Sequence, residues 1–326
     1  MHGYGFGYDA QAMEALGYTQ EQIPDNYLDL MSFVSAWNDP DNAEKWEEYA
    51  LLEYEGEYAS PFFYDILEAV DHYYATSGQP MKLDDPIFRS LMEAWQSMET
   101  DNIELHVDWG MEDEVPEEIQ ELWDKSMLFS TYQNYSTEMP YNHHTMCPLK
   151  LTPDTEPVVP MYVEVFFVNP NSENLDACIR YLEAYVEAIE PLMLADRCPD
   201  MNEPQENSYY ASNVENMQKV LKDLEKSLSE ADEADKQALQ DDLDSYKEYV
   251  EDYIATERYV STKETIAAYR ALMEHACVAK PSILYQNTGD DSFLTLRQRF
   301  LDQQITLDQF IQEGDSKLRL MQLENQ

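Results

Sequence analysis

The sequence contains few basic residues. Its 326 residues include 20 Lys and Arg against 66 Asp and Glu, which gives a formal net charge of −46 at pH 7. Nucleic acids and anionic membrane surfaces repel such a chain, which argues against both as partners. The acidic excess does not identify a ligand, because an acidic, well-solvated surface explains it equally well.

Cysteine is scarce, and long apolar runs are missing. The four cysteines, Cys147, Cys178, Cys198 and Cys277, are widely spaced and form no C-x-x-C pair. Their spacing leaves free thiols and one or two disulfides open. No segment approaches the roughly 20 apolar residues of a membrane span. Residues 1–10 have neither the basic nor the apolar region of a signal peptide.

Motifs for catalysis and cofactor binding are missing as well. The sequence has no P-loop, no dinucleotide-binding glycine pattern, no G-x-S-x-G and no H-E-x-x-H. His143, His144 and Cys147 lie close together, but adjacent histidines rarely face one metal ion. Carboxylate pairs carry no information in so acidic a chain. We therefore expect a protein without catalytic residues, metal or cofactor.

The clearest apolar run covers residues 160–190, and its period changes midway. Residues 162–168 are β-branched and aromatic, which predicts a strand closed by the turn at Asn169–Asn171. Ser172 is placed to cap a helix that follows. The apolar positions of that helix recur every three or four residues: Leu175, Ile179, Leu182, Val186 and Ile189. This stretch predicts the strand–turn–helix arrangement of an α/β fold.

Capping signals predict helices along most of the remaining chain. Residues 1–8 read as extended, and residues 128–135 as a short strand or helix. Capping boxes are expected at Ser261 with Glu264 and at Thr306 with Gln309. The expected helices cover residues 9–16, 26–37, 60–74, 85–98, 117–123, 261–273, 293–301 and 306–321.

Two heptad-patterned segments predict a helical hairpin over residues 213–257. Apolar positions step by three and four from Val214 to Leu228, and again from Leu239 to Tyr253. A short polar segment joins them, so we expect antiparallel helices. The hairpin is either a strut packed on its own domain or an arm that binds a partner.

Three passages together resemble the extracellular solute-binding proteins of ABC importers, of the sugar-binding type. The first is similar to an I-N-P-x-S-x-N motif followed by a helix. It rests on Val168, Asn169, Ser172 and Asn174, with Tyr181 in place of the usual Phe. The second, residues 4–38, has Asn26 and Tyr27 where a Thr-Trp pair is usual. The third is the tail, through Phe300, Leu301, Ile305, Thr306, Phe310 and Leu318, with Gln303 or Gln304 where Gly is usual.

The resemblance implies a helix-rich α/β fold of the type II periplasmic-binding-protein kind. One lobe, nearly complete, would comprise residues 1–157 and 276–326. The other, partial, would comprise residues 158–275 with the inserted antiparallel hairpin. It also implies non-catalytic binding of a solute, most simply a carbohydrate, for delivery to the permease subunits of an ABC transporter. The location would be extracellular, with the protein anchored at the cell surface.

Aromatic residues supply the candidate ligand contacts. The chain has 24 Tyr and 5 Trp, and aromatic faces stack on the C–H surfaces of sugars. Several tyrosines lie in irregular sequence where a cleft is expected, and the resemblance places Tyr8 beside the hinge. We expect ligand contacts at Tyr4, Tyr8, Trp37, Tyr132 and Tyr135.

Two other functions stay open: a carbohydrate-active enzyme, and a helical interaction module that uses the hairpin. The resemblance further implies that the opening strands and helices of the N-terminal lobe do not form part of this sequence. On that reading we expect weak or no sugar binding, and self-association through the strand at residues 162–168.

Overall fold

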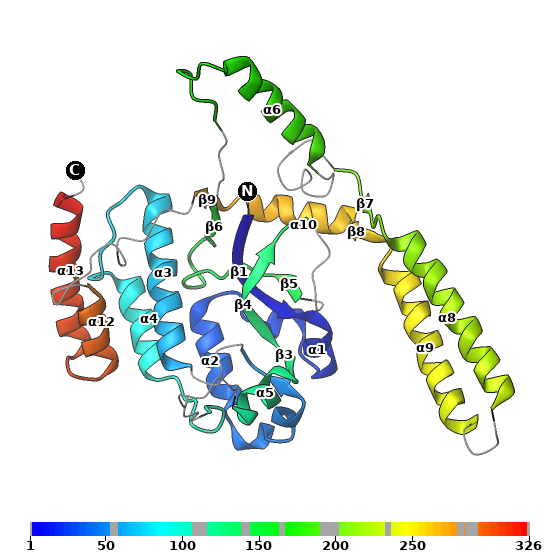
Figure 1. Ribbon diagram of the computed structural model, residues 1–326. Coiled ribbons are helices and arrows are strands. Elements are labelled where there is room, and N and C mark those ends of the chain that lie inside the picture. The colour runs from blue at the N-terminus through cyan, green and yellow to red at the C-terminus, as the bar shows by residue number, and fades with distance from the viewer. Residues whose placement is uncertain are drawn as a thin grey trace. The chain divides into compact units, whose positions relative to one another are not determined.

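The computed structural model describes residues 2–52, 58–105, 116–137, 144–162, 167–189, 202–231, 236–278, 284 and 293–324. The chain divides into two compact units (Figure 1). The first unit comprises Met1–Tyr135, Pro140–Val165 and Leu272–Gln326, and the second comprises Ser136–Met139 and Phe166–Ala271. The assignment of such units to the lobes of a solute-binding protein stays a prediction.

A small mixed sheet organises the first unit around strand β1 (His2–Asp9). Strand β1 pairs antiparallel with β4 (Phe129–Tyr135), β5 (His144–Met146) and β6 (Val159–Tyr162). Strand β6 in turn pairs in parallel with β9 (Ala276–Val278). A second, two-stranded sheet joins β2 (Tyr49–Ala50) to β3 (Ser126–Met127). The expected extended segment over residues 1–8 is thus confirmed for the described residues, and it forms the centre of the sheet.

The helices of the first unit begin where capping side chains stand. Asp9 accepts hydrogen bonds from the backbone at the start of α1 (Ala10–Ala15), and Gly17 follows that helix with φ +81°. Asn26 caps α2 (Tyr27–Trp37), and Asp85 caps α4 (Pro86–Gln96). Thr306 and Gln309 form the expected capping box at the start of α13 (Leu307–Glu324). The remaining α-helices described in this unit are α3 (Ala59–Ser77), α5 (Glu117–Trp123) and α12 (Phe293–Leu301).

Aromatic side chains from distant parts of the chain form the core of the first unit. The rings of Phe300 and Phe310 stack with centroids 4.7 Å apart. Phe63 on α3 lies 5.5 Å from Phe300 and 5.7 Å from Phe310. These contacts hold the C-terminal helices α12 and α13 against α3. The core therefore closes between residues far apart in sequence.

The second unit contains the expected helical hairpin. Helices α8 (Tyr210–Glu230) and α9 (Lys236–Thr256) lie side by side (Figure 1). Tyr210 at the start of α8 stacks on Tyr253 near the end of α9, with ring centroids 6.1 Å apart. Asn213 donates a hydrogen bond to the Tyr253 hydroxyl at 2.8 Å. The antiparallel pairing predicted from the heptads is confirmed.

Other elements of the second unit flank the hairpin. Strands β7 (Gln205–Glu206) and β8 (Tyr259–Ser261) pair antiparallel, and α10 (Lys263–Met273) follows β8. The capping box expected at Ser261 is wrong by one residue. Thr262 accepts the hydrogen bond from the backbone of Thr265, because Ser261 is the buried last residue of β8.

Helix α6 (Leu175–Ala188) also differs from expectation. Asn174, rather than Ser172, stands at its N-cap, and Ser172 accepts a hydrogen bond from the Asn174 backbone. The helix has no buried residue, and Ile179 in its apolar stripe is 44% exposed. Of the strand expected over residues 162–168, Tyr162 lies in β6, and the described residues 167 and 168 are not part of a strand. Residues 163–166 lie outside the described part of the chain.

Two further observations concern the apolar character of the helices and the cysteines. None of the helices in the described ranges combines the length and apolar composition that crossing a membrane requires. Cys147 and Cys178 are free thiols, Cys277 on β9 is half-buried, and Cys198 lies outside the described residues. Burial raises the pKa of the Cys147 thiol to about 11, so this group is protonated and weakly nucleophilic at neutral pH.

Candidate binding cavity

A cavity of about 240 Å³ opens within the first unit. Its walls come from β1, α2, α3, β4 and the chain segment between residues 148 and 160. This volume lies below the roughly 300–1,000 Å³ typical of pockets for drug-sized ligands. The cavity therefore suits a small solute.

Helix α3 presents a polar face to this cavity. Asp65, Glu68, His72 and Tyr73 line it, together with Ala69. Their spacing of three and four residues places them on one side of the helix. The opposite face is apolar and buried in the core, through Phe62, Phe63, Ile66, Leu67, Val70 and Tyr74. The same helix thus builds the core and one wall of the cavity.

Tyr27, the first residue of α2, brings a phenol to the cavity wall. It is half-buried, and burial raises its pKa well above the usual value, with Asp65 and Glu68 adding to the shift. The Tyr27 hydroxyl makes no hydrogen bond within the described part of the chain. It remains protonated at neutral pH and retains an O–H donor for a ligand.

His72 is a buried titratable group of the cavity wall. Its side chain is 8% exposed and makes no hydrogen bond to any residue in the described ranges. Burial lowers the pKa of the imidazole, and the charges of Glu68 and Asp71 act in the opposite direction. The ring is therefore neutral at pH 7, with one N–H donor and one nitrogen acceptor.

Carboxylates dominate the charge of the cavity. Asp65 and Glu68 come from α3, and Glu156 comes from the segment after β5. No Lys or Arg side chain is among the described residues that line the cavity. These carboxylates do not form a metal site: within the described ranges, no three His, Cys, Asp or Glu side chains are placed to share a metal ion. His143, from the cluster considered in the sequence, lies outside those ranges.

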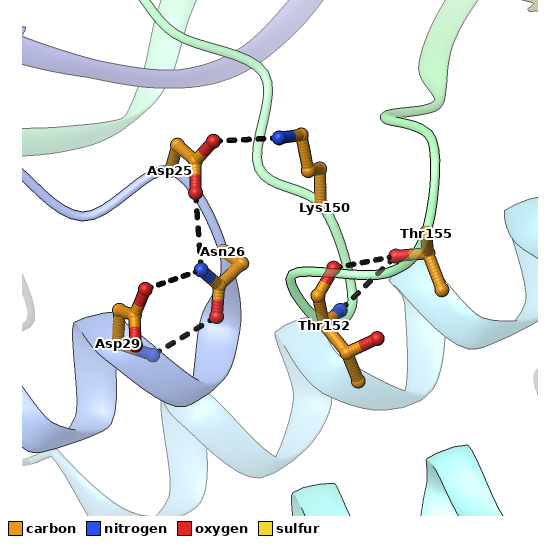
Figure 2. A network of polar contacts seen from close by, with 6 residues as sticks. All are labelled: Asp25, Asn26, Asp29, Lys150, Thr152 and Thr155. Atoms are coloured by element: carbon orange, nitrogen blue, oxygen red, sulfur yellow. Dashed lines mark hydrogen bonds and ion pairs between the residues drawn. The ribbon is translucent and has the colours of Figure 1, made fainter.

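A polar network fixes the segment that closes one side of the cavity (Figure 2). Lys150 forms an ion pair with Asp25 at 2.7 Å, and its backbone carbonyl accepts a hydrogen bond from the Tyr27 backbone. The Lys150 contact lowers the pKa of Asp25. Asn26, 1% exposed, donates to both Asp25 and Asp29. The start of α2 and the segment around Lys150 are thereby held together, which positions Tyr27 in the wall.

A turn completes this segment. Thr155 donates from its hydroxyl to the Thr152 carbonyl at 2.9 Å and accepts from the Thr152 backbone at 3.0 Å (Figure 2). Leu151 and Glu156, on either side of the turn, both line the cavity. The turn therefore sets the spacing of an apolar and an acidic wall residue.

Of the five residues expected to contact ligand, Tyr135 lines the cavity. Tyr8 and Trp37 are buried at 4% and 2% exposure and belong to the core instead. The Tyr8 hydroxyl donates to the Gln20 side chain at 3.0 Å. Tyr4 and Tyr132 lie on β1 and β4, and their side chains are outside the described part of the structure.

The polar wall residues of α3 and Tyr27 were not among the expected contacts. The signal that was available is the recurrence of Asp65, Glu68 and His72 at three- and four-residue spacing between buried apolar positions. On an outer helix such residues face solvent, so only the packing around α3 shows that they face a cavity.

Tyr135 is held tightly at this wall. Its hydroxyl donates to the Phe6 carbonyl at 2.8 Å, and burial raises its pKa well above the usual value. A Cβ atom on Gly5 would collide with the ring and hydroxyl of Tyr135. Because Gly5 has no side chain, the backbone of β1 can lie in close contact with the Tyr135 ring.

Gly5→Ala is expected to lower the free energy of unfolding by about 1–3 kcal/mol, because the new methyl group displaces a buried ring. Urea denaturation followed by tryptophan fluorescence measures this change. In a Tyr135→Leu background the ring is absent, so Gly5→Ala should lower the free energy of unfolding by clearly less than it does in the wild type. Equal costs in the two backgrounds would show that the collision with Tyr135 is not the cause.

His72 is expected to make the stability of the first unit depend on pH. Its pKa is lowered in the folded state, so below about pH 6.5, the ordinary histidine pKa, the unfolded chain binds a proton that the folded chain does not. Stability is retained above that pH and falls as the pH drops below it. His72→Gln should remove this part of the dependence.

The measurement is urea denaturation of both chains at a series of pH values above the range in which the neighbouring carboxylates titrate. The other titratable groups that face His72 along α3 or across the cavity are Glu68, Asp71, Asp65, Glu156, Tyr27 and Tyr135. Identical pH dependence in wild type and His72→Gln would refute the assignment to His72.

Comparison of the chain with models of protein families, with curated proteins and with solved structures finds no match.

Proposed function

We propose that the chain binds a small solute, without catalysis, in the cavity of the first unit. The observation that carries the proposal is a pair of polar side chains, Tyr27 and His72, that line the cavity with no hydrogen-bond partner among the described residues. Both side chains line the cavity, so a solute bound there can accept a hydrogen bond from the Tyr27 hydroxyl and exchange one with the His72 imidazole.

A carbohydrate suits the composition of the walls. Aromatic rings of Tyr27, Tyr73 and Tyr135 offer faces for sugar C–H groups, and the carboxylates accept hydrogen bonds from hydroxyl groups. The resemblance to sugar-binding proteins of ABC importers suggests the same ligand class. Extracellular delivery of the solute to permease subunits of an ABC transporter is the cellular role that we propose on that resemblance.

The cavity changes one expectation drawn from the sequence. Weak binding was expected because a ligand held between two lobes loses most of its contacts when one wall is missing. The described residues that line this cavity all belong to the first unit, so we propose that a solute binds there without a second lobe. We therefore propose that the chain as given binds its solute measurably.

The test is isothermal titration calorimetry of the full chain against monosaccharides, with chromatographic analysis of the same sugars after long incubation. Saturable heat at a ratio of one sugar per chain, with each sugar recovered unchanged, is the expected result. Conversion of a sugar would favour the carbohydrate-active enzyme instead. Absence of heat from every sugar would overturn carbohydrate binding.

A further inference from the structure

The charged side chains that line the cavity, in the part of the chain that the structure describes, are all acidic. Asp65, Glu68 and Glu156 line it, and no Lys or Arg is among the residues that do. An anionic solute would meet these carboxylates at close range, which disfavours its binding. Glu68 forms no ion pair or side-chain hydrogen bond among the described residues, so a neutral solute would leave its charge without a cationic partner.

The buried imidazole of His72 gives an independent indication. The side chain lines the cavity, is 8% exposed and makes no hydrogen bond among the described residues. A neutral imidazole offers a nitrogen acceptor as well as a donor. An ammonium group has three N–H donors and no acceptor, so it matches carboxylates and an imidazole acceptor together.

The aromatic wall fits the same ligand. Tyr27 and Tyr73 line the cavity beside Glu68. The face of a tyrosine ring attracts an organic cation, and the attraction is larger where water is excluded. Three kinds of group in this wall thus favour positive charge.

We infer that the solute carries an ammonium group, as an amino sugar does, and that Glu68 and His72 bind that group. This inference rests on the proposed function and specifies its ligand class. Glu68 and His72 stand four residues apart on α3, so one ammonium group can reach both side chains.

The test compares three sugars that share one ring and differ in charge: glucose, glucosamine and glucuronate. Each is titrated calorimetrically into the full chain at constant pH and ionic strength. Glucosamine is expected to bind at least about tenfold more tightly than glucose, because hydrogen bonds to charged groups are the stronger ones. Glucuronate is expected to bind more weakly than glucose.

Two matched variants locate the effect. Glu68→Gln keeps the shape of the side chain and removes its charge, so the ratio of the glucosamine affinity to the glucose affinity should fall to about threefold or less. Glu14→Gln makes the same change of net charge on the exposed surface of α1, outside the cavity, and should leave the preference unchanged.

The outcomes separate the two proposals. Equal affinities for glucose and glucosamine would refute the ammonium site and leave carbohydrate binding intact. Two non-sugar probes, 1,4-diaminobutane and 1,4-butanediol, test whether the cavity binds an ammonium group that is not part of a sugar. Binding of the diamine alone would support the ammonium site and refute the carbohydrate class, whereas no binding by any probe would overturn both proposals.

Discussion

Replacing Phe310 with alanine is expected to lower the free energy of unfolding of the first unit by about 3–5 kcal/mol. Phe310 on α13 is fully buried and stacks on Phe300 at 4.7 Å. It also contacts Phe63 on α3 and Phe88 on α4, with ring centroids 5.7 and 6.4 Å away. Removal of this ring leaves a cavity between four helices, α3, α4, α12 and α13.

A matched control stands on the same helix. Leu320 on α13 is 61% exposed, so Leu320→Ala should change stability by no more than about 0.5 kcal/mol. Thermal and urea denaturation of both variants measure the difference. A loss below about 1 kcal/mol for Phe310→Ala would show that the aromatic cluster does not hold the C-terminal helices to α3.

Local signals in the sequence account for the helices that were predicted correctly. Asp9, Asp85 and Thr306 each stand at an N-cap and accept hydrogen bonds from the first turn. An N-cap side chain bonds to the backbone within three residues of itself, so it can be recognised in the sequence without knowledge of the fold. The heptad spacing of the hairpin is local in the same sense, and it gave the pairing of α8 with α9 correctly.

The sheet and helix α6 depend on packing that the sequence does not display. Strand β6 pairs in parallel with β9, which lies more than a hundred residues later in the chain. Such pairings leave no signal in local periodicity. In α6 the apolar spacing was correct for a helix, yet Ile179 and Val186 are exposed, because periodicity does not reveal whether a partner covers the face.

The candidate site was predictable only in part. Tyr135 was expected and does line the cavity, whereas Tyr8 has the same residue type and is buried in the core. Glu68 and His72 looked like polar positions of an outer helix. They differ from solvent-facing residues because the segment from residue 148 to 160 lies across the cavity from them. The ion pair of Lys150 with Asp25 helps to hold that segment in place. The helix-rich α/β class is confirmed, and the periplasmic-binding fold stays a prediction.

Ala69→Phe is expected to abolish solute binding while the fold is kept. Ala69 lies on the cavity face of α3, between Glu68 and His72 in the wall. A phenyl ring at this position projects into a cavity of about 240 Å³ and occupies the space that a solute needs. We expect affinity for any solute bound there to fall by at least about 100-fold, equal to about 2.7 kcal/mol.

The control uses the same substitution on the same helix. Ala75 is exposed near the end of α3 and does not line the cavity, so Ala75→Phe should bind as wild type does. Far-UV circular dichroism and thermal denaturation of both variants establish that each is folded. A substitution that unfolds the chain would show itself there as a lost transition.

The measurement that tests the proposed binding site most directly is therefore one calorimetric titration of a bound sugar, made in parallel on wild type, Ala69→Phe and Ala75→Phe. Binding by wild type and Ala75→Phe, with none by a folded Ala69→Phe chain, is the predicted result. Undiminished binding by Ala69→Phe would contradict the assignment, because the solute would then bind somewhere other than this cavity.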